Sequence, residues 1–173
     1  MSSCAMEIKF NNFADGIHHF EFVEKASEME LGEEFIEDVL VNCKMDKSNS
    51  QIVLSCELQV KADLECDRCT ENYLTELTNN FEIVYLLSES EKNEESDDLS
   101  VHYISPDADK ISIKDEVTDF ALLAVPFKKL CDESCKGLCT SCGTDLNKED
   151  CNCDKDTTNP VWEPLMKLKD KLN

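Results

Sequence analysis

Residues 52–64, IVLSCELQVKADL, decide the fold, because apolar or small residues alternate with other residues throughout this stretch. The first set is Ile52, Leu54, Cys56, Leu58, Val60, Ala62 and Leu64, and from position 57 the second set is Glu57, Gln59, Lys61 and Asp63. Successive side chains of a β-strand point to opposite faces. The pattern therefore predicts a strand with one buried face and one solvated face.

Further strands are expected on both sides of this one. Residues 35–45 also read as a strand, and the turn-forming residues 47–50 predict an antiparallel hairpin with residues 52–64. Residues 73–87 keep apolar residues on one parity and are expected to pair with the same strand across the segment 66–69. Residues 18–23 are a weaker strand candidate.

One helix, at about residues 113–125, is expected after the strands. Ser112 followed by Asp115 fits an N-cap with a capping box, and acidic residues suit the positive end of a helix. Pro126 disfavours helical geometry at the residue before it, which predicts an end near Val125. One apolar face is expected, formed by Ile113, Val117, Phe120, Ala121 and Ala124.

These elements predict an α+β fold that is mainly antiparallel β, a twisted meander or a partly open barrel, with one helix and a C-terminal cysteine-rich zinc-binding segment. Residues 1–125 are the expected β-rich core. Within them, residues 88–98 carry six acids and no apolar residue, which predicts a mobile loop. Residues 126–173 are the expected zinc segment, and leucines at helical spacing predict a short helix at 164–173.

The net charge disfavours contact with nucleic acid or an anionic membrane. The chain holds 38 acidic and 17 basic residues, a formal charge of −21, and most of the excess lies in residues 1–100. A basic protein is the expected direct partner. No stretch approaches the roughly 18 apolar residues of a membrane span, and the start lacks the order of a secretory signal. A cytoplasmic protein with no membrane partner is expected.

The strongest chemical signal is the segment 131–153, CDESCKGLCTSCGTDLNKEDCNC. Its six cysteines are Cys131, Cys135, Cys139, Cys142, Cys151 and Cys153. Cys139 to Gly143 has the CxxCG form of a zinc knuckle, in which a tight turn aims two sulfur atoms at one point. Thiolates favour zinc over magnesium or calcium, so zinc is the expected cofactor, with free thiols or an iron–sulfur cluster as alternatives. Spacing does not decide whether the upstream or the downstream pair completes the site.

A second CxxC pair, Cys66 and Cys69, falls at the tip of the predicted hairpin. No helix N-terminus is expected there to lower a thiol pKa, which favours a metal-binding or structural role over redox catalysis. Eight cysteines would suffice for two sites of four. Arg68 between the sulfurs is expected to balance thiolate charge, touch a phosphate or stand as an exposed turn residue.

The remaining cysteines, Cys4, Cys43 and Cys56, are interpreted as ordinary small buried or terminal residues. No catalytic set emerges from the other residues. His18, His19 and His102 lie outside the cysteine motifs, and the four glycines form no phosphate-binding loop. His18 and His19 are interpreted as strand residues, and a non-enzymatic function is expected.

The order of these motifs resembles the YceD-like family. The matching positions are Cys66, Arg68 and Cys69 of a CxRC motif, then Cys135, Gly137, Leu138, Cys139, Cys142, Gly143, Leu146 and Asn147 of CKGLCxxCGxxLN. The resemblance implies a role in the accumulation, processing or stability of large-subunit (23S) ribosomal RNA. The family tends to show an Asp-Pro-Arg-like turn further on, where this chain reads Asn-Pro-Val-Trp at 159–162.

Three functional hypotheses follow. The first is a ribosome-biogenesis factor that docks on a basic ribosomal or ribosome-assembly protein, so that contact with precursor ribosomal RNA is indirect. The second is a zinc-knuckle protein that binds the RNA directly, through Arg68 and the lysines Lys128, Lys129, Lys136, Lys167, Lys169 and Lys171. The third is a thiol–disulfide exchanger that uses Cys66 and Cys69.

Overall fold

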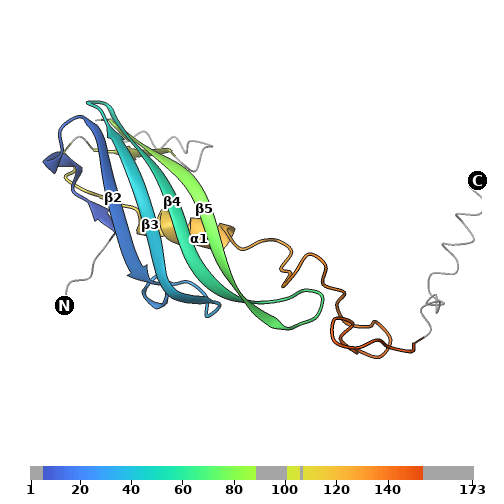
Figure 1. Ribbon diagram of the computed structural model, residues 1–173. Helices are drawn as coiled ribbons and strands as arrows, with labels where there is room; N and C mark the ends of the chain where they lie inside the picture. Colours follow the sequence, from blue (N-terminus) through green and yellow to red (C-terminus); the bar gives the residue numbers. More distant parts are fainter. Residues whose placement is uncertain (1–5, 89–100, 106, 154–173) are drawn as a thin grey trace, which may run out of the picture.

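A five-stranded sheet in the order β2-β3-β4-β5-β6 dominates the computed structural model, which describes residues 6–88, 101–105 and 107–153 (Figure 1). The long strands β2 (Gly16–Lys25), β3 (Phe35–Lys47), β4 (Gln51–Glu65) and β5 (Asn72–Leu87) form an antiparallel meander. The short strand β6 (Val101–Ile104) pairs with β5 in parallel. Between the described strands the sheet stays open, with β2 and β6 at its edges, so the meander is confirmed and no barrel closes.

The register of the meander follows from the alternation in the sequence. On β4 every second residue, from Ile52 to Leu64, is buried, as the period of two predicts. The hairpin turn lies at residues 48–50, which confirms the predicted β3–β4 pairing. The weaker candidate at residues 18–23 is confirmed inside β2. A register shift between Ile36 and Leu40 contains Glu37 at φ 62°, typical of a bulge.

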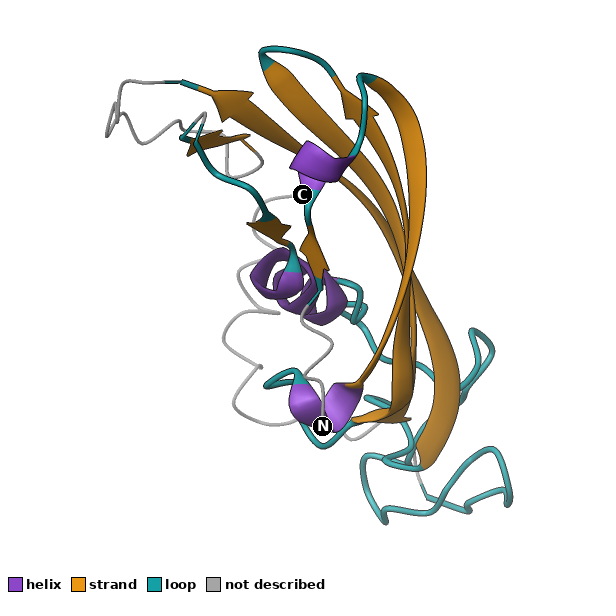
Figure 2. Cartoon of the chain, turned by 90° about the vertical axis from the view of Figure 1, so that its left-hand side faces the viewer, coloured by secondary structure: helices purple, strands orange, loops and turns teal. Residues whose placement is uncertain are grey.

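The core lies on the concave face of the sheet, where helix α1 (Lys114–Leu123) packs (Figure 2). Val117 and Ala121 are buried there, and Phe120 stacks on Phe81 of β5 with ring centroids 4.3 Å apart. A ribbon of β1 (Glu7–Ile8) and β7 (Ile111–Ser112) and the 3₁₀ turns η1 (Phe10–Asn12) and η2 (Ala26–Glu28) complete the described elements.

The helix predicted at about residues 113–125 is confirmed as α1, but the expected N-cap at Ser112 is wrong by one residue. Ile113 is the N-cap residue and no side chain caps the helix, because Ser112 belongs to β7 and pairs with Glu7. The Ser112 hydroxyl lies 3.5 Å from the backbone nitrogen of Lys114, at the outer limit of a hydrogen bond. At the other end the helix stops at Leu123, two residues before the expected end, a difference typical of fraying helix termini.

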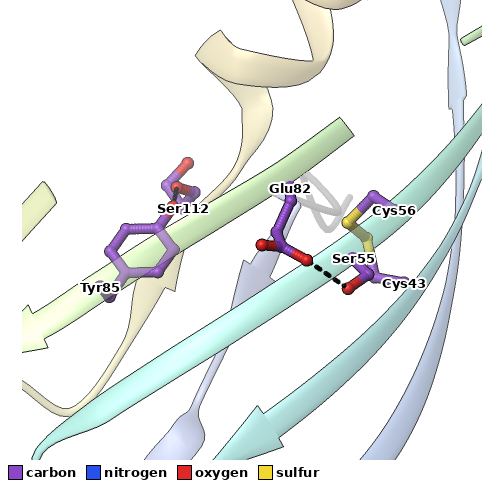
Figure 3. The surroundings of a disulfide bond; sticks show 6 residues. All are labelled: Cys43, Ser55, Cys56, Glu82, Tyr85 and Ser112. Atoms are coloured by element: carbon purple, nitrogen blue, oxygen red, sulfur yellow. Dashed lines mark hydrogen bonds between the residues drawn. A yellow bond between two sulfur atoms is a disulfide. The ribbon is translucent and has the colours of Figure 1, made fainter. Parts of the chain in front are cut away.

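The interpretation of Cys43 and Cys56 as ordinary buried thiols is also wrong, because the two residues form a disulfide (Figure 3). They lie directly opposite each other on β3 and β4, with Cα atoms 4.1 Å apart. Both side chains point to the buried face. A pair this close brings two side chains into direct contact across the strands. The disulfide therefore fastens the centre of the β3–β4 hairpin.

Several expectations fall outside the described residues, among them the mobile loop at 88–98 apart from Ser88, the helix at 164–173, and the placement of Cys4. Among the helices that the structure describes, none has the length and apolar character needed to cross a membrane.

Candidate metal centres

Two groups of four cysteines bring their sulfur atoms within 4.8 Å of one another, and each group could hold a metal ion. The first, here the hairpin cluster, contains Cys66, Cys69, Cys131 and Cys135. The second, here the knuckle cluster, contains Cys139, Cys142, Cys151 and Cys153. The structure thus brings together all the cysteines singled out from the sequence and decides the partition that spacing left open.

The hairpin cluster joins parts of the chain that are far apart in sequence. Cys66 and Cys69 lie in the β4–β5 turn, where Thr70 at φ 57° and a hydrogen bond from its backbone N–H to the Cys66 carbonyl (2.9 Å) close the loop. Cys131 and Cys135 come from the segment after α1, which reaches the hairpin tip (Figure 1). The cluster therefore joins the end of the sheet to the cysteine-rich segment.

The sulfur separations in this cluster suit a zinc ion. The Cys66 and Cys135 sulfurs lie 3.9 Å apart, and the Cys69 and Cys131 sulfurs lie 3.7 Å apart. A tetrahedral site with zinc–sulfur bonds of about 2.3 Å places its sulfurs about 3.8 Å apart. Cys131 is exposed and the other three thiols are buried. The donor set and its spacing fit zinc.

Backbone contacts hold the cysteine segment on the hairpin tip. The backbone N–H of Asp67 donates to the Lys129 carbonyl (2.8 Å), and the Lys129 N–H donates to the Asp67 carboxylate (2.7 Å). The guanidinium of Arg68 donates to the carbonyls of Glu133 (3.1 Å) and Cys135 (2.7 Å). Arg68 therefore stabilises the loop at residues 131–135, which carries two of the cluster cysteines. A phosphate contact of this side chain stays a prediction.

The close approach of the cysteine segment to the β4–β5 turn explains why position 137 is a glycine. Gly137 lies at φ 75°, in the left-handed region, and a Cβ at this position would lie 2.7 Å from the Arg68 carbonyl oxygen. The same carbonyl accepts a hydrogen bond from the Leu138 N–H (2.9 Å). Position 137 therefore needs glycine for both its conformation and the space it leaves.

The knuckle cluster is local in sequence. The Gly143 N–H donates to the Cys139 carbonyl (2.9 Å), and the Cys139 N–H donates to the Thr144 carbonyl (2.8 Å), which forms the tight turn expected of CxxCG. Gly143 lies at φ 75°. The Cys142 sulfur lies 3.1 Å from the Thr144 hydroxyl. Cys139 is buried, Cys142 is exposed, and the other two thiols are half-buried.

Hydrogen bonds lower the pKa of one thiol in each cluster to about 6. This thiol is Cys66 in the hairpin cluster, mainly through the backbone of Cys131, and Cys139 in the knuckle cluster, mainly through the backbone of Cys142. Hydrogen bonding with Cys66 raises the pKa of Cys131 to about 12, and hydrogen bonding with Cys142 raises that of Cys153 to about 12. At neutral pH each set of sulfurs alone would therefore hold both thiolates and protons.

Zinc uptake near neutral pH is expected to release protons, because Cys131 and Cys153 must ionise to become ligands. Protons compete with the metal, so affinity is expected to fall as pH falls, and more steeply below about pH 6, where Cys66 and Cys139 also take up protons. Calorimetric titration in two buffers of different ionisation enthalpy measures this release. Identical enthalpies in the two buffers would contradict it, and protein with alkylated thiols is the control.

The histidines singled out from the sequence lie away from the cysteine clusters, whereas the singled-out lysines that the structure describes lie near the hairpin cluster. His18 donates to the Ala14 carbonyl (2.8 Å) from β2, and His102 lies 3.4 Å from the Glu116 carboxylate, so neither belongs to a cysteine cluster. His19 also lies on β2, which confirms the interpretation of both β2 histidines as strand residues. Lys128 and Lys136 are exposed beside the hairpin cluster. Lys167, Lys169 and Lys171 lie outside the described residues.

Sequence reasoning missed the residue that links the two clusters. The side chain of Asn147 donates to the Cys135 sulfur (3.3 Å) and accepts from the backbone N–H of Lys136 (2.7 Å). Its position in the CKGLCxxCGxxLN motif was the available signal, but the motif gives no contact. Only the folded loop shows that a residue of the knuckle cluster's loop touches a sulfur of the hairpin cluster.

Comparisons with known proteins identify the family of the chain. A family model described as "Large ribosomal RNA subunit accumulation protein YceD" matches residues 54–169, which include all eight clustered cysteines. The chain is 30% identical over 70 residues to "Large ribosomal RNA subunit accumulation protein YCED homolog 1, chloroplastic" of Arabidopsis thaliana. The alignment spans 40% of this chain and 22% of that relative. No solved structure matches the chain. Since the family model covers most of its length, the chain belongs to the YceD family of large ribosomal RNA subunit accumulation proteins.

Proposed function

We propose that this protein is a non-enzymatic ribosome-biogenesis factor that holds zinc in both cysteine clusters and docks on a basic ribosomal or ribosome-assembly protein. Family membership supports the role in large-subunit ribosomal RNA accumulation. The structural observation that carries the proposal is that each cluster offers four cysteine sulfur atoms as ligands. Four protein ligands fill a tetrahedral zinc shell and leave no position for a reacting water, which is typical of structural rather than catalytic zinc.

The charge of the loaded clusters supports a protein partner. One Zn²⁺ with four thiolates has a formal charge of about −2, so metal binding adds negative charge to the cysteine segment. Residues 126–153 already hold five acidic and four basic residues. Of these bases, Lys148 forms an ion pair with Glu71 (2.6 Å) and Lys129 is half-buried. Few free cations remain in the described part of the segment to neutralise phosphates, as direct RNA binding requires.

Burial argues against the redox alternative. The thiol of Cys66 has a lowered pKa, which on its own would suit thiol–disulfide exchange. However, Cys66 is 0% exposed and Cys69 is 4% exposed, so an incoming disulfide has no access to either sulfur. A lowered pKa is equally required of a zinc ligand, because the thiolate is the form that binds.

Docking on a basic protein predicts that the partner stays bound when RNA is removed. In co-purification of the tagged protein, the captured proteins are expected to survive ribonuclease and to fall away as ionic strength rises, since complementary charges are screened by salt. Complete release by ribonuclease would favour direct RNA binding instead.

A charge-reversed double variant, Lys128→Glu with Lys136→Glu, separates these two readings. Both lysines are exposed beside the hairpin cluster, so their reversal is expected to leave protein docking within a factor of about two while weakening direct RNA binding, because two phosphate contacts are replaced by repulsion. Loss of the partner in this variant would count against the proposal. Zinc content measured on the same sample serves as the control for folding.

A further inference from the structure

The loop at residues 144–148 connects two cysteines of the knuckle cluster, but a residue within it contacts the hairpin cluster. Its ends lead to Cys142 and Cys151, both members of the knuckle cluster. At its centre, the Asn147 side chain donates to the Cys135 sulfur of the hairpin cluster (3.3 Å). A change in the knuckle cluster that moves this loop would therefore also move Asn147 relative to the Cys135 sulfur.

The orientation of this amide is set by its other partners. Its oxygen accepts the backbone N–H of Lys136 (2.7 Å), so its nitrogen must face the sulfur. That nitrogen also donates to the Asp145 carboxylate (2.8 Å), and the Asn147 backbone N–H donates to the same oxygen (2.9 Å). Every polar atom of the side chain is thereby engaged, which fixes one rotamer.

Backbone contacts tie the loop to the hairpin side. Leu138 forms a β-bridge with Asp145, and the Leu146 N–H donates to the Gly137 carbonyl (2.9 Å). Beyond them, the Lys148 ammonium lies 2.6 Å from the Glu71 carboxylate of the hairpin. The loop thus lies between the two clusters and is anchored to both.

We propose that Asn147 is a positioning residue for the hairpin cluster and couples it to the knuckle cluster, so that zinc in the knuckle cluster raises the zinc affinity of the hairpin cluster. The inference rests on the zinc sites of the proposed function. Hydrogen bonds to ligand atoms orient them, and their loss costs about 10- to 100-fold in metal affinity. A metal ion that fixes both ends of the loop holds Asn147 at the sulfur. Coupling of this kind is reciprocal, so the hairpin ion must favour the knuckle ion by the same factor.

The test is a double-mutant cycle on zinc-loaded full-length protein. A chelator and a thiol-alkylating reagent are added together, and peptide mass spectrometry follows alkylation of Cys66 and Cys69 separately from that of Cys139. Because Cys66 and Cys69 are buried, they are alkylated only after the zinc has left and the cluster has opened. Asn147→Ala is expected to accelerate alkylation of the two hairpin thiols about 10- to 100-fold. Asn147→Asp keeps an acceptor for the Lys136 N–H and loses the donor to sulfur, so it is expected to act in the same direction. Asn152→Ala, an exposed asparagine in the same segment, is the matched control and is expected to change nothing.

The second arm of the cycle removes the knuckle cluster with Cys151→Ser and Cys153→Ser. These changes are expected to accelerate alkylation of Cys66 when Asn147 is present and to add nothing in the Asn147→Ala background. Additive effects, or no effect of the knuckle changes on Cys66, would overturn the coupling while leaving two zinc sites in place. Wild-type protein that takes up no zinc would overturn the zinc sites and the coupling together. Circular dichroism of the sheet checks that each variant is folded.

Discussion

Replacing Cys69 with serine is expected to remove one metal ion per chain and to release residues 126–153 from the β4–β5 hairpin. Cys69 and Cys131 are 62 residues apart in sequence, and an ion held between them closes that loop. Zinc binding contributes about 10–16 kcal/mol in small zinc-dependent folds, which is far more than the few hydrogen bonds of Asp67 and Arg68 can supply. The sheet should persist, because its buried face is made by its own strands and α1.

Native mass spectrometry and limited proteolysis measure this result. The variant is expected to carry one ion where the wild type carries two, and to be cut in residues 124–130 while β2–β5 stay protected. Cys142→Ser is the matched control, because it removes a knuckle ligand and leaves the four hairpin thiols in place. A variant that keeps two ions, or that loses its strand signal, would show that the cysteine segment and the sheet are not organised in this way. We propose on this basis that the region after residue 125 forms a distinct zinc segment.

Gly137→Ala is expected to destabilise the docked segment much more than Gly143→Ala. Both glycines lie at φ 75°, so both substitutions place a Cβ in the left-handed region at a cost of about 1–2 kcal/mol. Only at Gly137 does the added Cβ meet backbone, 2.7 Å from the Arg68 carbonyl oxygen, whereas nothing lies within 4 Å at Gly143. Relief of that clash requires the Leu138–Arg68 hydrogen bond to open and the hairpin cluster to spread.

Zinc release in the presence of a chelator distinguishes the two glycine variants. Gly143→Ala reports the strain alone, and the excess effect of Gly137→Ala reports the contact with Arg68. We expect the hairpin-cluster ion to leave Gly137→Ala at least about tenfold faster than it leaves Gly143→Ala, which corresponds to about 1.4 kcal/mol. Equal release rates would mean that the two segments can separate slightly without loss of the metal site.

The strands could be predicted because their signal is local. From Ile52 to Leu64, the polarity of each residue indicates which face of the strand it occupies. Antiparallel pairing then follows where two alternating segments are separated by a short turn. The same logic could have found the Cys43–Cys56 disulfide, since a turn centred between Asn49 and Ser50 places the two residues opposite each other. A shift of the turn by one residue would separate them, and the sequence does not locate a turn that finely.

The sequence by itself predicted three strands that alternate in burial, a weaker candidate for a fourth, a helix after them, and eight cysteines at spacings that could hold a metal ion. Only the tertiary structure decided which cysteines lie close together and that Asn147, in the loop of one cluster, contacts a sulfur of the other. The alternation of buried and exposed residues along a strand is a local pattern with a period of two, so the sequence alone can predict it. A metal site depends on where distant segments meet, and Cys66 and Cys135 come together only because the segment after α1 docks on the hairpin tip.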